Sequence, residues 1–203
     1  EIGTPPPLDQ LPPLPANLAP PKNEPDGMTL MRRAYQVDSG PFPVGKFTPE
    51  DWRKHRWGYY RMIEKVDAEI GKVLAALRQA GLEENTLIVF TADHGECAGA
   101  HGFNQKTVLY DESARVPLII ACQGKTAGGT TDKLVNTGID LLPTMLDFAG
   151  LEAPPLKRLP GRSLLPLAFG QPVSVWREFV VVENNMNQAG EIDGLRPQME
   201  GRM

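Results

Sequence analysis

The sequence predicts an α/β fold built around a mainly parallel β-sheet. Two continuous apolar runs rich in β-branched residues, 86–92 and 115–122, have the composition of strands covered on both faces. Helical periodicity precedes the first run, over residues 48–81, and follows the second run, over residues 138–150. Because helices alternate with buried strands, we expect right-handed crossovers and a mainly parallel sheet.

Residues 48–81 predict one long amphipathic helix. Thr48 is a suitable N-cap and Pro49 suits the first helical position. The carboxylates of Glu50 and Asp51 then lie near the positive end of the helix dipole. Apolar side chains recur at intervals of three and four at Ile63, Val66, Ile70, Val73, Leu74 and Leu77. Gly81 marks the end of the helix.

The later part of the chain predicts a second helix and a third strand. Residues 138–150 (GIDLLPTMLDFAG) have helical periodicity, and Gly150 marks the end of that helix. Residues 177–184 (REFVVVEN) read as a third strand. We therefore expect a core segment over residues 51–170 and the start of a truncated C-terminal subdomain over residues 171–203.

Residues 1–50 are expected to form a proline-rich connecting arm. Residues 1–27 have polyproline-type spacing and neither helical nor strand periodicity, and the stretch from there to about Glu50 reads as irregular. The arm is either an ordered connection or a disordered linker, and a proline-rich ligand for a partner module is the alternative.

Composition excludes several classes of protein. With 203 residues and a net charge of −4, the chain offers no electrostatic basis for binding nucleic acid. No apolar run approaches the roughly 20 residues of a transmembrane helix. Two cysteines, Cys97 and Cys122, do not make a disulfide framework or a four-ligand zinc site, and Cys122 is expected to be a buried thiol. The chain shows neither an initiator methionine nor a signal peptide, and we expect it to be a piece of a longer protein.

Polar residues with catalytic potential follow directly after the first predicted strand. Asp93 and His94 come immediately after the run 86–92, and Gly95 allows a sharp turn of the backbone. In sheets of this kind, ligands bind at the carboxyl ends of strands. A carboxylate and an imidazole there could both turn toward one metal ion. The alternative is a loop cap with a surface histidine.

The same stretch contains a candidate anion-binding group. Lys106 is either a solvated side chain or a point charge that holds a tetrahedral anion. His101, in "GAHG", is expected to be held in place between small residues. The groups expected mostly at the surface or in salt bridges are Tyr110, Asp111, Glu112 and Arg115. Without an evident nucleophile, these residues indicate metal-assisted transfer of a charged group such as phosphoryl or sulfuryl.

The segment "TADHGECAGAHGFNQKTVLYDESARVPLII" resembles the second signature region of the type I sulfatases, which belong to the alkaline phosphatase superfamily. The preceding "GYYRMIEKVDAEIGKVLAALRQAGLEENTLIVF" and the later "GIDLLPTMLDFAGLEAPP" and "LPGRSLLPL" are similar to the family's flanking segments. The resemblance runs from about Trp57 to Leu167. It implies part of an alkaline-phosphatase-like sheet flanked by helices, incomplete, with the start of a C-terminal subdomain.

The resemblance also implies an activity and its site. Sulfatases of this type hydrolyse sulfate esters with a formylglycine nucleophile and a divalent cation. By resemblance, Asp93 and His94 are metal ligands, Lys106 contacts the sulfate, and His101 either contacts substrate or has a structural role. Calcium is the cation that the resemblance favours, with manganese or magnesium as alternatives. Imidazole itself suits manganese or zinc better.

The chain departs from the family pattern in one large respect. The nucleophile motif C/S-x-P-x-R is absent from the 203 residues, and no counterpart of the family's first two metal-binding aspartates is present. We therefore expect the chain alone to be inactive and to need the N-terminal part of the same protein as its partner.

The expected substrate is a sulfated small molecule or carbohydrate. The alternatives are a phosphonate monoester or phosphodiester hydrolase of the same superfamily, in which the Asp-His pair also occurs, and a non-catalytic binding module. The resemblance implies a periplasmic, secreted or lysosomal location.

Overall fold

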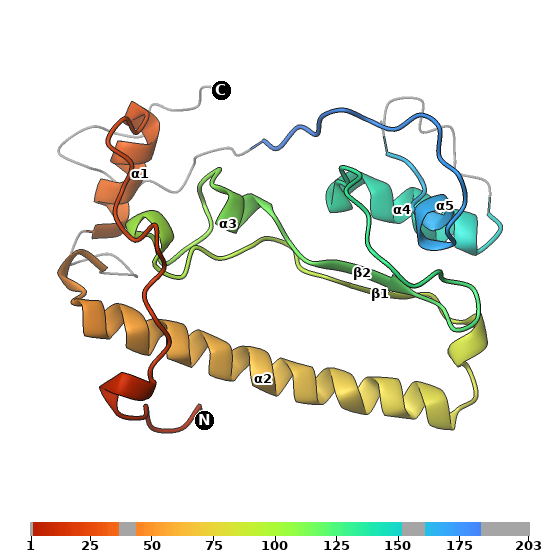
Figure 1. Ribbon diagram of the computed structural model, residues 1–203, viewed down its shortest axis with the longest axis horizontal. Helices are drawn as coiled ribbons and strands as arrows, with labels where there is room; N and C mark the ends of the chain where they lie inside the picture. The colour runs from red at the N-terminus through yellow and green to blue at the C-terminus, as the bar shows by residue number, and fades with distance from the viewer. Residues whose placement is uncertain (1, 37–43, 152–160, 184–203) are drawn as a thin grey trace. The chain divides into compact units, whose positions relative to one another are not determined.

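The computed structural model describes residues 2–36, 44–151 and 161–183 (Figure 1). The chain divides into two compact units. Unit 1 comprises Glu1–Gly71, Asp93–Val116 and Val182–Met203, and unit 2 comprises Lys72–Ala92 and Pro117–Val181. Within the described ranges, none of the helices is both long enough and apolar enough to cross a membrane.

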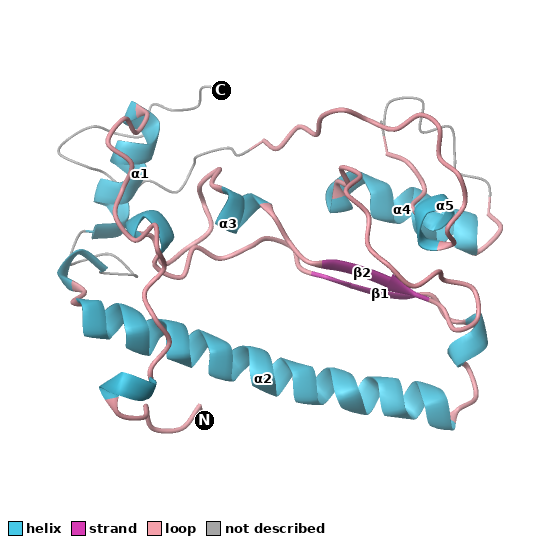
Figure 2. Ribbon diagram, viewed as in Figure 1, coloured by secondary structure: helices cyan, strands magenta, loops and turns pink. Residues whose placement is uncertain are grey.

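The long predicted helix is confirmed as α2, Pro49–Gln79 (Figure 2). Its start is a capping box, in which Thr48 Oγ1 accepts from the Asp51 N–H at 3.2 Å and Asp51 Oδ2 accepts from the Thr48 N–H at 2.9 Å. Gly81 follows the end of the helix with a φ of 67°, a conformation that glycine adopts without strain. The signals that predicted α2 are therefore the ones that delimit it.

Helix α1, Asp26–Gln36, was not predicted, and the expectation of irregular structure is wrong for these residues. Met31 on this helix is 1% exposed and belongs to a core cluster with Phe103. The other members of this cluster are Cys97, Ala100 and Val108. Burial against a distant loop stabilises the helix, and helical periodicity within an 11-residue segment cannot reveal such a contact.

Residues of the proline-rich arm form hydrogen bonds with α2 and with the loop that follows β1. Apart from the 3-10 helix η1, Leu8–Gln10, the arm has little regular structure before α1. Arg53 on α2 donates to the carbonyl oxygens of Pro12 at 2.9 Å and Leu11 at 2.5 Å. Further along, the Asn17 carbonyl accepts from the His101 N–H at 2.7 Å. These contacts place the arm against α2 and the loop that follows β1.

Both central strands are confirmed, but their predicted parallel arrangement is wrong. β1, Ile88–Thr91, pairs antiparallel with β2, Leu118–Ala121, with Ile88 opposite Ala121. A parallel pair needs a crossover, usually a helix of several turns. The connection instead contains only the 3-10 helix η4, Ala100–Gly102, and the four-residue helix α3, Asp111–Ala114.

Both strands were predicted to be buried on both faces, but some of their side chains are exposed to solvent. The side chains of Phe90 and Ile119 are 40% and 58% exposed. The apolar stripe of α2 is likewise open, because Ile63, Val66 and Val73 are 50%, 57% and 68% exposed. The residues that the structure describes therefore cover neither surface completely.

The predicted third strand is wrong for residues 177–183, which have no regular secondary structure, while residue 184 lies outside the described part. Phe179 and Val181 are 74% and 69% exposed. Strand geometry depends on ladder hydrogen bonds to a neighbour. Neither described strand pairs with this segment, since the sheet contains β1 and β2 alone among the described residues.

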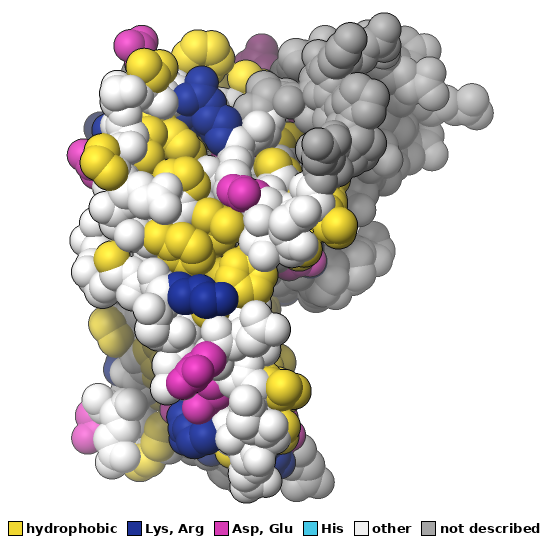
Figure 3. All heavy atoms as spheres, turned by 90° about the vertical axis from the view of Figure 1, so that its right-hand side faces the viewer, with side chains coloured by type: hydrophobic (Ala, Val, Ile, Leu, Met, Phe, Trp, Pro, Cys, Tyr) yellow, Lys and Arg dark blue, Asp and Glu magenta, His cyan; other side chains and the backbone are white. Residues whose placement is uncertain are grey.

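The second predicted helix is confirmed as α4, Thr137–Phe148, followed by the short α5, Leu165–Ala168. The Asn136 side chain caps α4 by accepting from the Gly138 N–H at 3.0 Å. Unit 2 also has a groove of about 510 Å³ lined by residues of β2, the loop 127–131 and α5, and none of the predicted site residues lines it. Apolar side chains gather on the face drawn in Figure 3.

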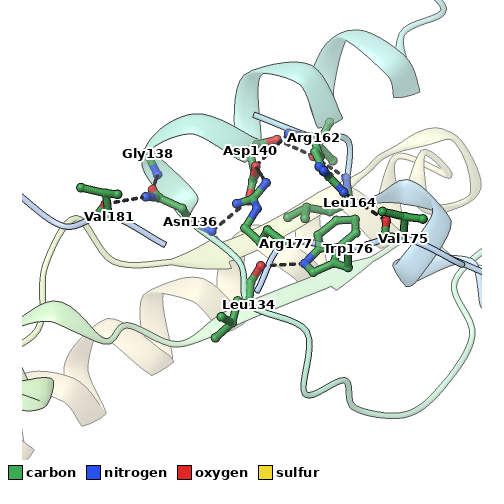
Figure 4. Close-up of polar contacts among 11 residues, drawn as sticks. Leu134, Asn136, Gly138, Asp140, Arg162, Leu164, Val175, Trp176, Arg177 and Val181 are labelled. Carbon is green, nitrogen blue, oxygen red and sulfur yellow. Dashed lines mark hydrogen bonds and ion pairs between the residues drawn. The ribbon is translucent and has the colours of Figure 1, made fainter. Parts of the chain in front are cut away.

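A buried ion pair anchors the segment after α5 to α4 (Figure 4). Asp140 is fully buried, and its two carboxylate oxygens accept from the Arg177 guanidinium at 2.6 and 2.7 Å. The backbone N–H groups of Asn136 and Arg162 each donate to the same carboxylate at 2.8 Å. Burial alone would raise the pKa of Asp140, but these four hydrogen bonds together lower it. The carboxylate is therefore fully satisfied inside unit 2.

Candidate active site

Asp93 and His94 place a carboxylate oxygen and an imidazole nitrogen side by side after β1. Asp93 Oδ2 lies 3.4 Å from His94 Nε2. His94 Nδ1 lies 2.9 Å from the Gly95 carbonyl oxygen, so Nδ1 carries the hydrogen and donates it. In its neutral form, the ring would present the Nε2 lone pair next to a carboxylate oxygen, an arrangement that a cation or a proton between the two atoms would stabilise.

This pair fits a divalent cation. A separation of 3.4 Å suits two donors that each lie about 2.0–2.6 Å from one ion. The Asp93 and His94 side chains are 85% and 42% exposed, which leaves them accessible to an ion and to further ligands. Across the described residues there is no cluster of three or more His, Cys, Asp or Glu side chains that could hold a metal. A bound ion would need additional donors.

Gly95 is required because α3 approaches the backbone there. Its N–H donates to the Ser113 carbonyl at 2.8 Å. A Cβ at this position would collide with the carbonyl oxygen of Glu112. The sequence indicated a sharp turn at Gly95, whereas the structure shows a close contact with a helix 17 residues further along the chain.

Ser113 connects the segment that follows Asp93 and His94 to Lys106. While its carbonyl accepts from Gly95, its hydroxyl donates to the backbone carbonyl of Lys106. Ser113 is 5% exposed, so this bridge is buried. Sequence reasoning missed Ser113, because a serine within a short helix carries no local signal for a contact to another segment.

The pKa of Glu96 depends on its burial and on the charges of two predicted site residues. Burial raises the pKa of Glu96, and the charges of Lys106 and His94 oppose that increase. Its Oε1 also accepts from the Ala98 N–H at 3.2 Å. Lys106 and His94 therefore both favour the ionised form of this carboxyl group.

His101 is held firmly, as the sequence predicted. Its side chain is 16% exposed and its ring stacks on Tyr110 at 3.8 Å between centroids, with a 16° interplanar angle. His101 Nε2 lies 3.2 Å from Glu112 Oε2. The Asn17 side-chain amide lies 3.2 Å from the same nitrogen and donates to Glu112 Oε1 at 2.6 Å. Three segments of unit 1, which are the arm at Asn17, the loop at residue 101 and residues 110–112, thus meet at one imidazole.

Cys97 is not a candidate nucleophile. It is 2% exposed, and burial raises its pKa to about 12, so the reactive thiolate is scarce at neutral pH. Cys122 is 1% exposed, as predicted for a buried thiol.

The central part of this chain matches a known protein family. The family model described as Sulfatase matches residues 34–151, which is more than half of the chain. The chain belongs to the sulfatase family. Members of this family in general use a metal ion and a formylglycine residue.

Curated sulfatases support the assignment. Arylsulfatase K of Canis lupus familiaris is 41% identical over 125 residues, which cover 62% of this chain and 23% of the relative. N-acetylglucosamine-6-O-sulfatase of Bacteroides thetaiotaomicron is 35% identical over 129 residues, which cover 63% of this chain and 23% of the relative. This sulfatase chain therefore matches about a quarter of the length of these relatives.

Solved structures confirm the predicted alkaline-phosphatase-like fold and its incompleteness. A 2-O GAG sulfatase matches with a TM-score of 0.72 and 29% identity, over 86% of this chain and 38% of that one. The phosphonate monoester hydrolase of Silicibacter pomeroyi matches with a TM-score of 0.68 and 32% identity, over 85% and 35%. A protein solved in complex with its substrate D-glucosamine-2-N,6-O-disulfate matches with a TM-score of 0.55 and 32% identity, over 63% and 26%.

Proposed function

We propose that the full-length protein containing this chain hydrolyses sulfate esters with the help of a divalent cation. The observation that carries this proposal is the pair Asp93 and His94, whose donor atoms lie 3.4 Å apart after β1 in a chain of the sulfatase family. Residues 93–113 would form one part of the active site, and other parts of the protein would complete it.

Asp93 and His94 would hold the cation. When bound there, a divalent cation supplies Lewis-acid polarisation of the ester's sulfate group. The His94 Nδ1–H, bonded to the Gly95 carbonyl, keeps Nε2 free for this role. We propose calcium on the basis of the family resemblance, and manganese and magnesium are the alternatives that metal analysis of the purified protein would distinguish.

Lys106 would bind the sulfate. Its ammonium group offers up to three donors and a positive charge to sulfate oxygens, and would offset negative charge that develops as the ester bond breaks. Ser113 holds the Lys106 backbone, which limits where this ammonium group can reach. For His101, we propose the structural alternative, because Nε2 is engaged by Glu112 and Nδ1 is inaccessible to solvent.

The nucleophile would come from outside these 203 residues. The C/S-x-P-x-R motif is absent from them, and Cys97 is buried with a raised pKa. We propose that a formylglycine elsewhere in the protein attacks sulfur. The isolated chain is accordingly expected to show no turnover.

The proposed substrates are sulfated carbohydrates or small sulfate esters. This proposal is supported by a relative named as an N-acetylglucosamine-6-O-sulfatase and by a similar structure solved with a disulfated glucosamine. The net charge of −4 gives no support for a nucleic acid partner.

A second candidate function is phosphonate monoester hydrolysis. It is favoured by the 32% identity to the phosphonate monoester hydrolase of Silicibacter pomeroyi. The two candidates are separated by measuring kcat/KM of the full-length protein on 4-nitrophenyl sulfate and on 4-nitrophenyl phenylphosphonate, which share a leaving group. A higher value for the sulfate supports the proposal, and a value at least about tenfold higher for the phosphonate replaces it.

A further inference from the structure

Residues before α2 bind both backbone polar groups of His101. The His101 N–H donates to the Asn17 carbonyl at 2.7 Å, and Arg32 Nη1 donates to the His101 carbonyl. His101 adopts a left-handed conformation with φ 54° and ψ 19°. This conformation is unfavourable for a residue with a side chain, so hydrogen bonds from outside the loop are needed to maintain it.

The His101 side chain is fixed by the same set of neighbours. Burial would raise the pKa of Glu112, but hydrogen bonds from its own N–H, from Asn17 and from His101 lower it. A carboxylate only accepts, so His101 Nε2 carries the hydrogen that it donates to Glu112. The remaining nitrogen, Nδ1, is inaccessible to solvent, and none of the described residues provides it with a hydrogen-bond partner. Neither ring nitrogen is free to act on a substrate.

Arg32 extends this network into the core of unit 1. It is 7% exposed, forms an ion pair with Glu24, and lies over the ring of Phe103 at 4.3 Å from the ring centroid. The Tyr110 hydroxyl donates to Glu24 at 2.9 Å, and burial together with this carboxylate raises the pKa of Tyr110 to about 12. Arg32 therefore joins α1 to the loop at His101 and, through Glu24, to Tyr110 at the start of α3.

Glu112 and Ser113 are adjacent on α3, and each binds a different part of the site. Glu112 binds His101 and Asn17, whereas Ser113 binds the backbone of Lys106. A displacement of the arm or of His101 would therefore reach Lys106 along two routes. One route follows the loop from residue 101 to residue 106, and the other passes through α3.

We propose that Asn17 and Arg32 are positioning residues of the active site, which fix His101 and thereby the loop 97–106 that presents Lys106 to the sulfate. This inference rests on the proposed function. It gives Asn17 in the proline-rich arm and Arg32 in α1 a role in positioning the active site, although neither would touch the substrate. The arm, α1 and the loop all belong to unit 1.

The test uses kinetic coupling in the full-length protein with 4-nitrophenyl sulfate as the substrate. Asn17→Ala removes the amide that contacts Glu112 and His101, and is expected to lower kcat/KM about 5- to 30-fold. Lys106→Ala lowers it further, and in that background Asn17→Ala is expected to change kcat/KM by less than about twofold, because it acts through Lys106. Full additivity of the two effects would overturn the inference.

Two further variants make the readout specific. Asn17→Asp places a second carboxylate beside Glu112 and is expected to be worse than Asn17→Ala, because the two charges repel each other. Gln10→Ala changes an exposed side chain of the same arm and is expected to leave kcat/KM unchanged. Equal activity of Asn17→Asp and wild type would contradict the proposed geometry, as would wild-type activity of Asn17→Ala.

Hydrogen–deuterium exchange gives a second measurement that does not depend on turnover. Asn17→Ala and Arg32→Gln are expected to accelerate exchange at residues 97–106 compared with the wild type and with Gln10→Ala, while exchange in α2 stays unchanged. Unchanged exchange in this loop in a folded Asn17→Ala protein would overturn the inference. If the wild type hydrolyses no sulfate ester, the proposed function fails, and the exchange experiment still decides whether the arm holds the loop.

Discussion

The hydroxyl of Ser113 donates a hydrogen bond to the backbone carbonyl of Lys106. Because the carbonyl of Ser113 also accepts from Gly95, one buried residue links the proposed sulfate-binding lysine to the segment that carries Asp93 and His94. Helix α3 thus serves as a brace between two parts of the proposed site that are more than ten residues apart in the chain.

Replacement of Ser113 by alanine is expected to separate these two roles. Ser113→Ala removes the hydroxyl contact to Lys106 but keeps the backbone contact to Gly95, so kcat/KM for 4-nitrophenyl sulfate is expected to fall about tenfold while metal affinity is unchanged. Steady-state kinetics and metal titration of the full-length protein would measure the two effects. Wild-type kcat/KM, or a matching loss of metal affinity, would contradict this role for Ser113.

Gly95→Ala is expected to destabilise the site, because the added Cβ would collide with the Glu112 carbonyl. We expect a loss of about 1–3 kcal/mol in stability and weaker metal binding, since the backbone beside His94 must shift. Thermal unfolding and metal titration would measure both. Gly71→Ala is the matched control, because a Cβ there meets nothing within 4 Å and alanine favours the helix.

Loss of the Asp140 carboxylate is expected to destabilise unit 2 strongly. Asp140→Ala leaves the Arg177 guanidinium without its buried partner, and such changes cost about 3–5 kcal/mol. Asp147→Asn, at an exposed position of the same helix, is the control and is expected to have a much smaller effect. A melting temperature of Asp140→Ala equal to that of the control would rule out this anchoring role.

The lowered pKa of Asp140 predicts that the stability of the protein depends on pH. The pKa of Asp140 is lower in the folded state than its ordinary value of 3.8, so the folded state favours the ionised form. Its contribution to the free energy of unfolding is therefore complete above about pH 5 and is lost as the pH falls through the folded-state pKa. Melting temperatures measured from pH 7 to pH 3 should decline more steeply for the wild type than for Asp140→Asn.

The two cysteines are expected to resist alkylation in the native protein. Cys97 is 2% exposed with a pKa raised to about 12, and Cys122 is 1% exposed. Iodoacetamide at pH 8 followed by peptide mapping should find both unmodified unless the protein is first denatured. Rapid native labelling of Cys97 would show that the loop 97–106 opens readily.

The sequence was most informative where the determinants of structure are local. Helix α2 was predicted because its capping box and apolar ladder lie within the helix itself. Helix α1 was missed because burial of Met31 in a cluster with the 97–108 segment stabilises it. The direction of strand pairing was predicted wrongly, since neither β1 nor β2 encodes the path of the connection between them.

Some residues of the candidate site could likewise be predicted from the local sequence, and others could not. Asp93, His94 and Lys106 could be proposed from residue type and from their place after a strand. Ser113 and Asn17 could not, because each acts through partners in other segments of the chain. Residues 177–184 were predicted to form a strand, yet Arg177 pairs with Asp140 on α4, and residues 177–183 join no sheet among the described residues.

The central claim is that Asp93 and His94 bind a divalent cation needed for sulfate ester hydrolysis. The most direct measurement is hydrolysis of 4-nitrophenyl sulfate by the full-length protein after removal of metal with EDTA and after addition of calcium, with bound metal measured alongside. We predict that activity is lost and then restored, and that Asp93→Asn and His94→Gln each lower both bound metal and kcat/KM, the latter by about 100-fold or more. Full activity of the metal-free protein, or wild-type activity and metal content in Asp93→Asn, would contradict the claim.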